Sequence, residues 1–236
     1  NDIPSQSLSE MAGRVMFPVF STIQDDPVRL KSGLKKALTA LCLVNFPAMI
    51  GLAVIANPLV LVLLTEKWVA CVPYLQLLCL SGLLYPLHVM NLSVLQALGR
   101  SDLFLRLEIA KKILIVLNIA ITWRWGIIAM IEGMIGVSIV AYYVNSYYSG
   151  SLVNYSLREQ VRDVFPYLIM SVLMGGAVYA VGLLSFTNQW SLLLAQLGGG
   201  SSVYLCLCRA FRLTAFMEVW QMIFKKMPIL AAGTAR

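Results

Sequence analysis

The single histidine of the chain, His88, lies inside a long apolar stretch, where an ionisable side chain is costly and often functional. Ser81 and Tyr85 precede it by seven and three residues, and Asn91 follows it by three. This spacing places all four side chains on one face of a helix. If that face borders a cavity, the stripe can hydrogen-bond hydroxyl or phosphate groups of a ligand. The alternative is a histidine that is hydrogen-bonded within helix packing.

Two charged residues in other apolar segments are further candidates. Arg14 presents several donors in a fixed fork, which suits a phosphate or another acidic group. Its alternatives are an ion pair with Glu10, one helical turn earlier, or an anchor at the end of a helix. Glu132 could couple transport to a proton or a cation. An interfacial carboxylate that reaches outward is the alternative for Glu132.

The sequence lacks the residue patterns that are typical of catalytic or metal-binding sites. Its five cysteines lack metal-ligand spacing. No carboxylate stands beside His88 in the sequence, and no glycine-rich loop suited to a phosphate is present. We therefore expect no catalytic residue, no bound metal, no cofactor and no enzymatic activity. A membrane-embedded enzyme remains a minor alternative.

Long apolar segments must position these residues. The chain is 59% apolar and 12% charged, with a mean hydropathy of +0.80, which is outside the range of soluble domains. A membrane-crossing helix needs about 20 apolar residues. These features predict an all-α polytopic membrane protein with six complete transmembrane helices and the end of a preceding one. The predicted spans are 37–64, 72–98, 103–122, 126–148, 164–186 and 190–208.

Basic residues alternate between the connections of these spans. All but two of the eighteen Lys and Arg residues fall in every second connection or in the terminal segments, and the exceptions are Lys67 and Arg124. Because cytoplasmic loops retain basic residues, the alternation predicts a multi-pass inner-membrane protein with a cytoplasmic C-terminus. Anionic membrane lipids are the expected partners of the basic residues. No nucleic-acid partner is expected, since basic residues are not interleaved with stacking aromatics.

The first span is too long for one straight crossing at about 1.5 Å per residue. Pro58 predicts that a crossing helix over 38–56 ends there and that a short helix follows near the outer surface. Pro47 lies inside the crossing helix. We expect Asn45 beside it to hydrogen-bond the backbone groups that this proline frees, and a cavity role is the alternative for Asn45.

The opening segment, 3–20, has two different helix faces. Apolar residues repeat with helical spacing on one face, while Ser5, Ser9 and Gly13 lie on the other. We expect this helix to lie on the membrane surface or to line a wet cavity. The chain opens at Asn1 midway through a predicted span, which predicts that it is the C-terminal part of a longer protein.

Three segments together resemble a known family. They are RVMFPVFSTIQDDPVRLKSGLKKAL (14–38), FPAMIGLAVIANPLVLVLLTEKW (46–68) and LQALGRSDLFLRLEIAKK (95–112). In this order and spacing they resemble the C-terminal half of bacterial polysaccharide flippases of the Wzx/WzxC type. These flippases are members of the multidrug/oligosaccharidyl-lipid/polysaccharide exporter superfamily.

The resemblance implies a flippase that carries an undecaprenyl-diphosphate-linked oligosaccharide across the bacterial inner membrane by alternating access. Such a protein serves lipopolysaccharide or exopolysaccharide biosynthesis and needs an N-terminal lobe as its partner. A multidrug or cation exporter of the same superfamily is the main alternative. The implied divisions are the end of a helix and a basic loop (1–36), four helices of the C-terminal lobe (37–148), two additional helices (149–208) and a basic cytoplasmic tail (209–236).

Overall fold

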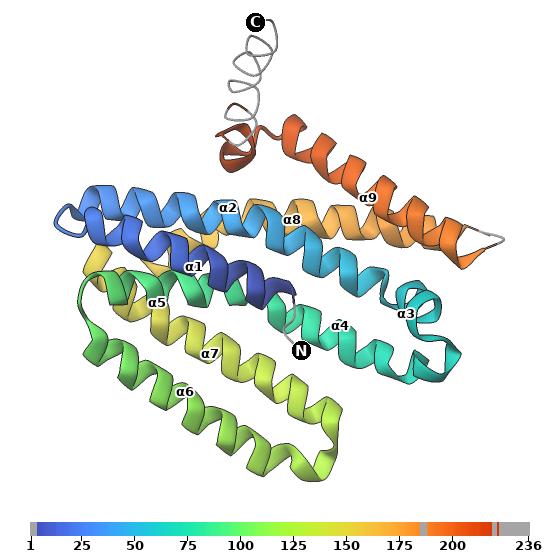
Figure 1. Ribbon diagram of the computed structural model, residues 1–236, viewed down its shortest axis with the longest axis horizontal. Coiled ribbons are helices and arrows are strands. Elements are labelled where there is room, and N and C mark those ends of the chain that lie inside the picture. Colours follow the sequence, from blue (N-terminus) through green and yellow to red (C-terminus); the bar gives the residue numbers. More distant parts are fainter. Residues whose placement is uncertain (1–3, 185–187, 219–220, 222–236) are drawn as a thin grey trace, which may run out of the picture.

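The computed structural model describes residues 4–184, 188–218 and 221 of the chain. Over these residues the chain is helical and contains no β-strand. Most helices run alongside one another in an elongated bundle, and α9 crosses it obliquely (Figure 1). The α-helices are α1 (Pro4–Thr22), α2 (Pro27–Val54), α3 (Ala56–Leu64), α4 (Val72–Gly82), α5 (Tyr85–Ala97), α6 (Ser101–Thr122), α7 (Ile127–Val153), α8 (Leu157–Gly182) and α9 (Gln189–Ala210), and the 3-10 helices are η1 (Glu66–Cys71) and η2 (Trp123–Trp125).

Five helical stretches among the described residues have the length and composition needed to cross a membrane. They are Pro27–Val54, Glu66–Ala97, Ile127–Val153, Leu157–Gly182 and Gln189–Ala210. The predicted class, an all-α polytopic membrane protein, is confirmed. The remaining predicted span, 103–122, corresponds to α6, which is 22 residues long but lies outside this set. Its first half carries Arg106, Glu108 and Lys111 among other charges, so its composition is less apolar than that of the other five.

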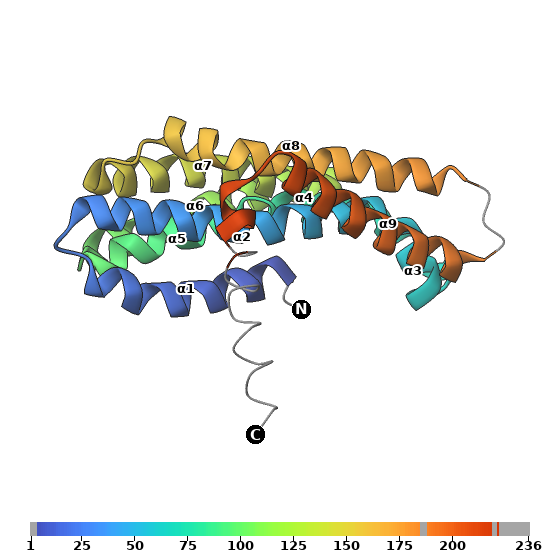
Figure 2. The ribbon, with the colours of Figure 1, turned by 90° about the horizontal axis from the view of Figure 1, so that it is seen from above.

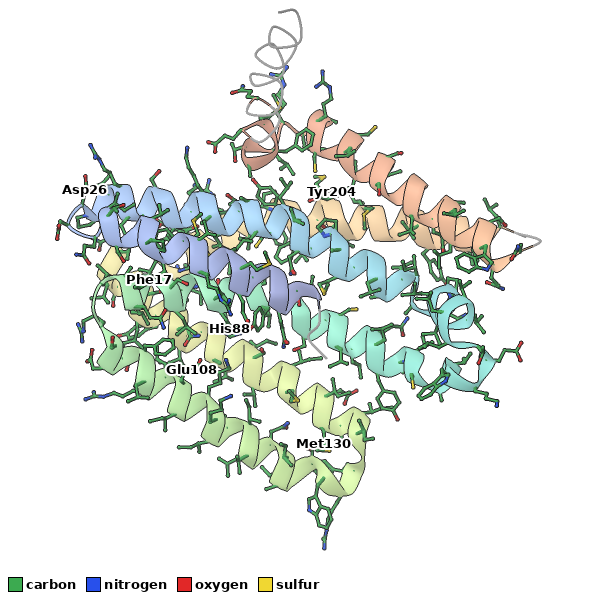
Figure 3. All side chains as sticks on the ribbon, viewed as in Figure 1. Phe17, Asp26, His88, Glu108, Met130 and Tyr204 are labelled. Carbon is green, nitrogen blue, oxygen red and sulfur yellow. The ribbon has the colours of Figure 1, made fainter. Side chains whose placement is uncertain are left out.

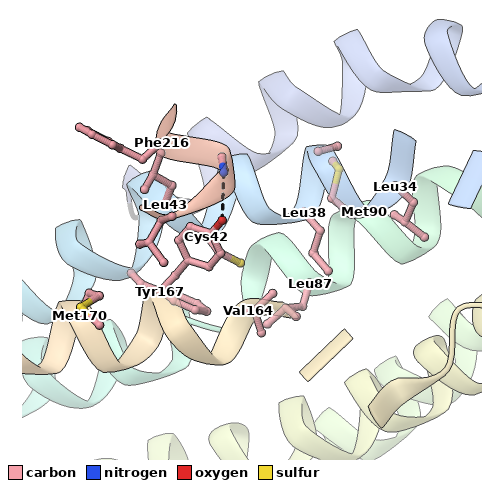
Figure 4. Close-up of a cluster of buried hydrophobic side chains, with 14 of the residues drawn as sticks. Leu34, Leu38, Cys42, Leu43, Leu87, Met90, Val164, Tyr167, Met170 and Phe216 are labelled. Atoms are coloured by element: carbon pink, nitrogen blue, oxygen red, sulfur yellow. Dashed lines mark hydrogen bonds between the residues drawn. The ribbon is translucent and has the colours of Figure 1, made fainter. Parts of the chain in front are cut away.

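The core lies around α2, which is covered by α8 on one side and by α5 on another. Leu34, Leu38 and Cys42 of α2 are at most 1% exposed. They belong to one cluster of buried side chains with Met90 of α5 and Val164 of α8 (Figure 4). Viewed from above, α1 lies on one side of α2, and α7 and α8 lie on the opposite side (Figure 2). The helices that carry the candidate residues therefore surround a common packed centre.

α2 begins earlier than predicted and ends almost where predicted. Its first residue is Pro27, because the Asp26 side chain accepts hydrogen bonds from the backbone amides of Val28 and Arg29, both at 3.1 Å. The helix ends at Val54, and α3 follows after Ile55. The expected break ahead of Pro58 is confirmed, and α2 extends well into the basic connection.

α1 turns its small polar face towards the bundle and its apolar face outwards. Its small polar face is buried, with Ser5 and Ser9 at most 1% exposed, while Met11 and Val15 of the apolar face are 67% and 59% exposed. A Cβ atom on Gly13 would lie 2.8 Å from Val89 Cγ1 of α5. Small residues permit this close helix contact, and in a membrane lipid can cover an outward apolar face. The polar face of α1 therefore does not lie on the membrane surface: it packs inside the bundle, where Ser5 and Gln6 border a cavity.

The basic connections gather at one end of the bundle. The α1–α2, α5–α6 and α7–α8 turns lie at this end, while η1 and η2, which carry Lys67 and Arg124, lie at the other (Figure 1). The alternation seen along the chain is thus also a separation in space. This separation matches the charge asymmetry that membrane insertion imposes on a helical bundle.

Ion pairs join α2 to α8 at the basic end. Lys31 Nζ lies 2.7 Å from Glu159 Oε2, and Lys35 Nζ lies 2.8 Å from Asp163 Oδ1. The Tyr155 hydroxyl donates to Asp163 Oδ2 at 2.8 Å. Burial, and then the hydrogen bond to Asp163, raise the pKa of the Tyr155 phenol above its ordinary value. Part of the basic charge at this end is therefore neutralised within the bundle.

Candidate functional site

A cavity of about 200 Å³ collects three of the predicted residues. It lies among α1, α4, α5, α6 and α7, and its polar lining comes from Ser5, Gln6, Ser81, Tyr85, His88, Lys111 and Ser138. The stripe of Ser81, Tyr85 and His88 thus faces a common space. Ser81 belongs to α4 while Tyr85 and His88 belong to α5, so the cavity straddles the break between these helices.

His88 is held by α7 through both of its ring nitrogens. It is 4% exposed and lies inside the bundle (Figure 3). Its Nδ1 is 3.2 Å from Asn145 Nδ2, and its Nε2 is 3.4 Å from Ser138 Oγ. Because the Asn145 amide nitrogen can only donate, Nδ1 accepts and the neutral ring carries its proton on Nε2, which donates to Ser138. Helix packing therefore uses the polar atoms of His88, while its ring also borders the cavity.

Asn91 lies outside this cavity. It is fully buried, and its amide nitrogen donates to Leu87 O at 2.8 Å and to Gln160 Oε1 at 3.0 Å. Its oxygen accepts from Ser149 and, at 3.1 Å, from Gln160 Nε2. Asn91 therefore shares a helix face with His88, but the tertiary structure assigns it to a contact among α5, α7 and α8.

Arg14 borders a separate hollow between α1 and α5. This hollow of about 470 Å³ is also lined by Glu10 and Phe17. The Glu10 carboxylate accepts a hydrogen bond from the Tyr85 hydroxyl at 3.0 Å. A Glu10–Arg14 ion pair within 4.0 Å is not among those of the described residues. Tyr85 thus connects the His88 cavity to the hollow that contains Arg14.

Glu132 stands apart from both. It is exposed and lines a hollow of about 540 Å³ among α2, α4 and α7, where Gln76 is the other polar side chain. One residue further along, Gly133 packs against α6: a Cβ atom there would come within 1.8 Å of Asn118 Oδ1. The tertiary structure therefore does not bring Glu132 to the cavity that contains His88.

Lys111 and Ser138 are among the lining residues that the sequence did not predict for the site. The Nζ of Lys111 lies 3.4 Å from Oε1 of Glu108, three residues earlier on α6. Its position on the cavity wall adds the only cationic group among the described lining residues. A signal for α7 was present, because Ser138, Tyr142, Asn145 and Ser149 recur at offsets of four, seven and eleven. This periodicity defines one polar helix face in an apolar span.

The cavity can bind a ligand that accepts hydrogen bonds and carries negative charge. Hydroxyl groups are supplied by Ser81 and Ser138, and a cation by Lys111. No group of three or more His, Cys, Asp or Glu side chains suited to a metal ion occurs in the described part of the chain. The fold and this cavity define the class of the protein: a multi-pass helical membrane protein with a polar cavity between its helices.

Comparison with known proteins finds relatives of the chain among polysaccharide biosynthesis and membrane proteins. The family model "Polysaccharide biosynthesis protein" matches residues 1–73. The chain is 35% identical over 139 residues to the lipopolysaccharide biosynthesis protein WzxC of Escherichia coli K12, covering 58% of this chain and 28% of that protein. It is 35% identical over 136 residues to a membrane protein in the cps region of Klebsiella pneumoniae, covering 58% of this chain and 27% of the relative.

A third relative extends the similarity towards the C-terminus. The teichuronic acid biosynthesis protein TuaB of Bacillus subtilis is 27% identical over 218 residues, which cover 87% of this chain and 43% of TuaB. The chain thus spans less than half the length of these relatives. No solved structure gives a significant match. Over these regions the chain is similar to proteins of polysaccharide biosynthesis, including the lipopolysaccharide biosynthesis protein WzxC, as the three sequence segments predict.

Proposed function

We propose that the protein to which this chain belongs is a flippase for lipid-linked oligosaccharides. In this proposal it moves an undecaprenyl-diphosphate-linked repeat unit across the bacterial inner membrane by alternating access, together with an N-terminal lobe. It performs no covalent chemistry and needs no cofactor. The observation that carries the proposal is the polar cavity lined by Ser81, Tyr85, His88 and Lys111 within a membrane-spanning bundle.

The chemistry of the cavity suits the polar part of such a lipid. Hydroxyl groups of Ser81 and Ser138 can exchange hydrogen bonds with sugar hydroxyls. Lys111 supplies a positive charge for an anionic group, and polar residues at membrane depth commonly mark a transport pathway. The names of the relatives, which refer to lipopolysaccharide and teichuronic acid biosynthesis, support a role in polysaccharide production.

Adjacent lysines provide the test of this cavity. Lys111 lines the cavity, whereas Lys112 is exposed on the same helix and does not line it. The complete gene, in a strain that lacks its own flippase, should restore surface polysaccharide. Lys111→Gln should lower the amount and Lys112→Gln should leave it unchanged, at equal protein levels in the membrane. Equal polysaccharide in both variants would place the substrate elsewhere, and failure of the correctly inserted wild type would refute the flippase proposal.

Arg14 has a test of its own. A bidentate contact to a phosphate group requires the planar guanidinium, while an anchor at the helix end requires only a positive charge. Under the proposal, Arg14→Lys lowers surface polysaccharide in the same strain. Full activity of this variant would assign Arg14 to the anchor role.

The separation of charges supports an orientation with the basic end, and the C-terminus, in the cytoplasm. Alkaline phosphatase, which is active only outside the cytoplasm, provides the measurement. A fusion after Trp125 of η2 should be active, and one after Tyr155 should be inactive. The reverse pattern would invert the proposed topology.

A further inference from the structure

Two prolines deprive carbonyl groups inside the bundle of their helical donors. Proline has no backbone N–H, so the carbonyl four residues before it loses its hydrogen bond. For Pro86 this carbonyl is that of Gly82, the last residue of α4. Asn45 of α2 donates its side-chain amide to this oxygen at 3.1 Å. The sequence suggests that Asn45 serves the backbone freed by Pro47, and this partner is wrong.

The carbonyl freed by Pro47 belongs to Leu43, and it has a different donor. The Tyr204 hydroxyl of α9 donates to Leu43 O at 2.8 Å. Both freed carbonyls are therefore satisfied from a neighbouring helix, as the absence of water in the hydrocarbon layer requires. Each of the two hydrogen bonds satisfies a carbonyl that a proline has freed. Only the bond made by Asn45 lies at the break between α4 and α5, beside the His88 cavity.

The break between α4 and α5 is short and tightly wound. Leu83 N bonds Leu80 O at 3.4 Å, and Leu84 N bonds Ser81 O at 3.3 Å, which is the spacing of a 3-10 turn. Regular helical bonding resumes when His88 N bonds Leu84 O at 3.2 Å. The break thus sets the rotation of Ser81, on α4, relative to His88, on α5.

Space around the break is closely filled. A Cβ atom on Gly82 would lie 2.8 Å from Met49 Sδ and 2.9 Å from Ser5 Oγ. Asn45 is 1% exposed, and its oxygen Oδ1 has no hydrogen-bond partner among the described residues. Its buried position is therefore explained by the single bond that its amide nitrogen makes to Gly82 O.

We propose that Asn45 is a positioning residue for the cavity: its amide replaces the N–H that Pro86 lacks and fixes the α4–α5 break. Asn45 acts through the backbone, and it does not line the cavity. Loss of its amide leaves the Gly82 carbonyl unpaired and lets α4 rotate against α5. Ser81 then becomes more accessible to water. The test by transport rests on the proposed function, whereas the test by thiol labelling does not.

Thiol labelling tests the inference without any transport assay. In the full-length protein freed of its native cysteines, Ser81→Cys reports access to the cavity through its reaction with a charged methanethiosulfonate. Asn45→Leu should raise the labelling rate by about threefold, the factor that corresponds to one interhelical hydrogen bond in a membrane. Tyr204→Phe removes the matching bond at Leu43 and should leave the rate unchanged.

A second variant, Pro86→Ala, serves as a background that distinguishes a positioning role of Asn45 from a general loss of stability. Pro86→Ala restores a backbone donor for Gly82 O, so adding Asn45→Leu to it should no longer raise the labelling rate. An equal increase in both backgrounds, no increase in either, or an equal increase from Tyr204→Phe would overturn the inference. Asn45→Ala also removes the amide and replaces Asn45→Leu if the latter does not insert.

Transport provides an independent readout. Surface polysaccharide should fall in Asn45→Leu and recover in part in the double variant with Pro86→Ala. If the wild-type protein moves no lipid-linked sugar, the proposed function fails while the labelling comparison still decides the role of Asn45.

Discussion

The buried amide of Gln160 offers a sharp test of how α8 is held against α5 and α7. Gln160 is fully buried in the first turn of α8. Its Oε1 accepts from Asn91 Nδ2 at 3.0 Å and from the Tyr142 hydroxyl at 3.3 Å. Its Nε2 donates to Asn91 Oδ1 at 3.1 Å and to Tyr155 O at 3.2 Å. Every hydrogen-bonding position of this side chain is used.

Gln160→Leu keeps the volume nearly constant and removes these four bonds. Hydrogen bonds between membrane helices contribute about 0.6 kcal/mol each on average, so the variant should lose about 2.5 kcal/mol of stability. Asn91 retains its bonds to Leu87 and Ser149, which avoids the larger penalty of an unpaired buried amide. In a chain of this size such a loss lowers Tm by about 5 to 10 °C.

A thiol-reactive dye measures this Tm in detergent once Cys71 and Cys206, which are not buried, have been replaced, because Cys42, Cys79 and Cys208 are buried and react on unfolding. Gln196→Leu is the matched control. Gln196 is 4% exposed, makes one bond to Val178 O at 3.2 Å, and has an unpartnered Oε1 among the described residues. The control should shift Tm by at most about 2 °C. Equal Tm shifts for the two variants, or an unchanged Tm for Gln160→Leu, would show that the loss of stability does not scale with the number of hydrogen bonds removed.

Two further predictions use the same melting assay and matched pairs. Gly133→Ala forces Asn118 away from α7 and should lower the free energy of unfolding by about 1 to 3 kcal/mol. Gly136→Ala meets open space and should leave it unchanged. Similar losses in both variants would contradict the close contact of α6 and α7. Asp26→Ala removes the cap of α2 and should cost about 1 kcal/mol, while Asp25→Ala should be neutral. A stable Asp26→Ala variant would show that α2 does not need this cap.

Helix positions and the sharing of faces could be predicted because they depend on local patterns. Hydropathy located the spans, and the spacing of Ser81, Tyr85 and His88 placed them on one face that does border a cavity. The break ahead of Pro58 follows from the missing N–H of proline, which acts on its own helix. Such properties need no knowledge of neighbouring helices.

Partners between helices could not be predicted. His88 meets Asn145 and Ser138, which lie more than 40 residues away in the sequence. Asn91 has the same helical phase as His88, yet it contacts Gln160 of α8 instead of the cavity. Any polar side chain in a span needs a partner, but several polar groups of similar chemistry compete, and only the packing of helices selects among them.

The direction in which a helix turns its apolar face was decided by the tertiary structure alone. On α1 the residues Ser5, Ser9 and Gly13 form the packed contact, and Met11 and Val15 face outward. The sequence by itself determined that the chain is helical, that it crosses a membrane and which connections share a side, because these properties follow from the contrast between lipid and water. It did not determine which face is inward, because lipid and the protein core are similarly apolar. Close packing of small residues and pairing of polar groups make that choice.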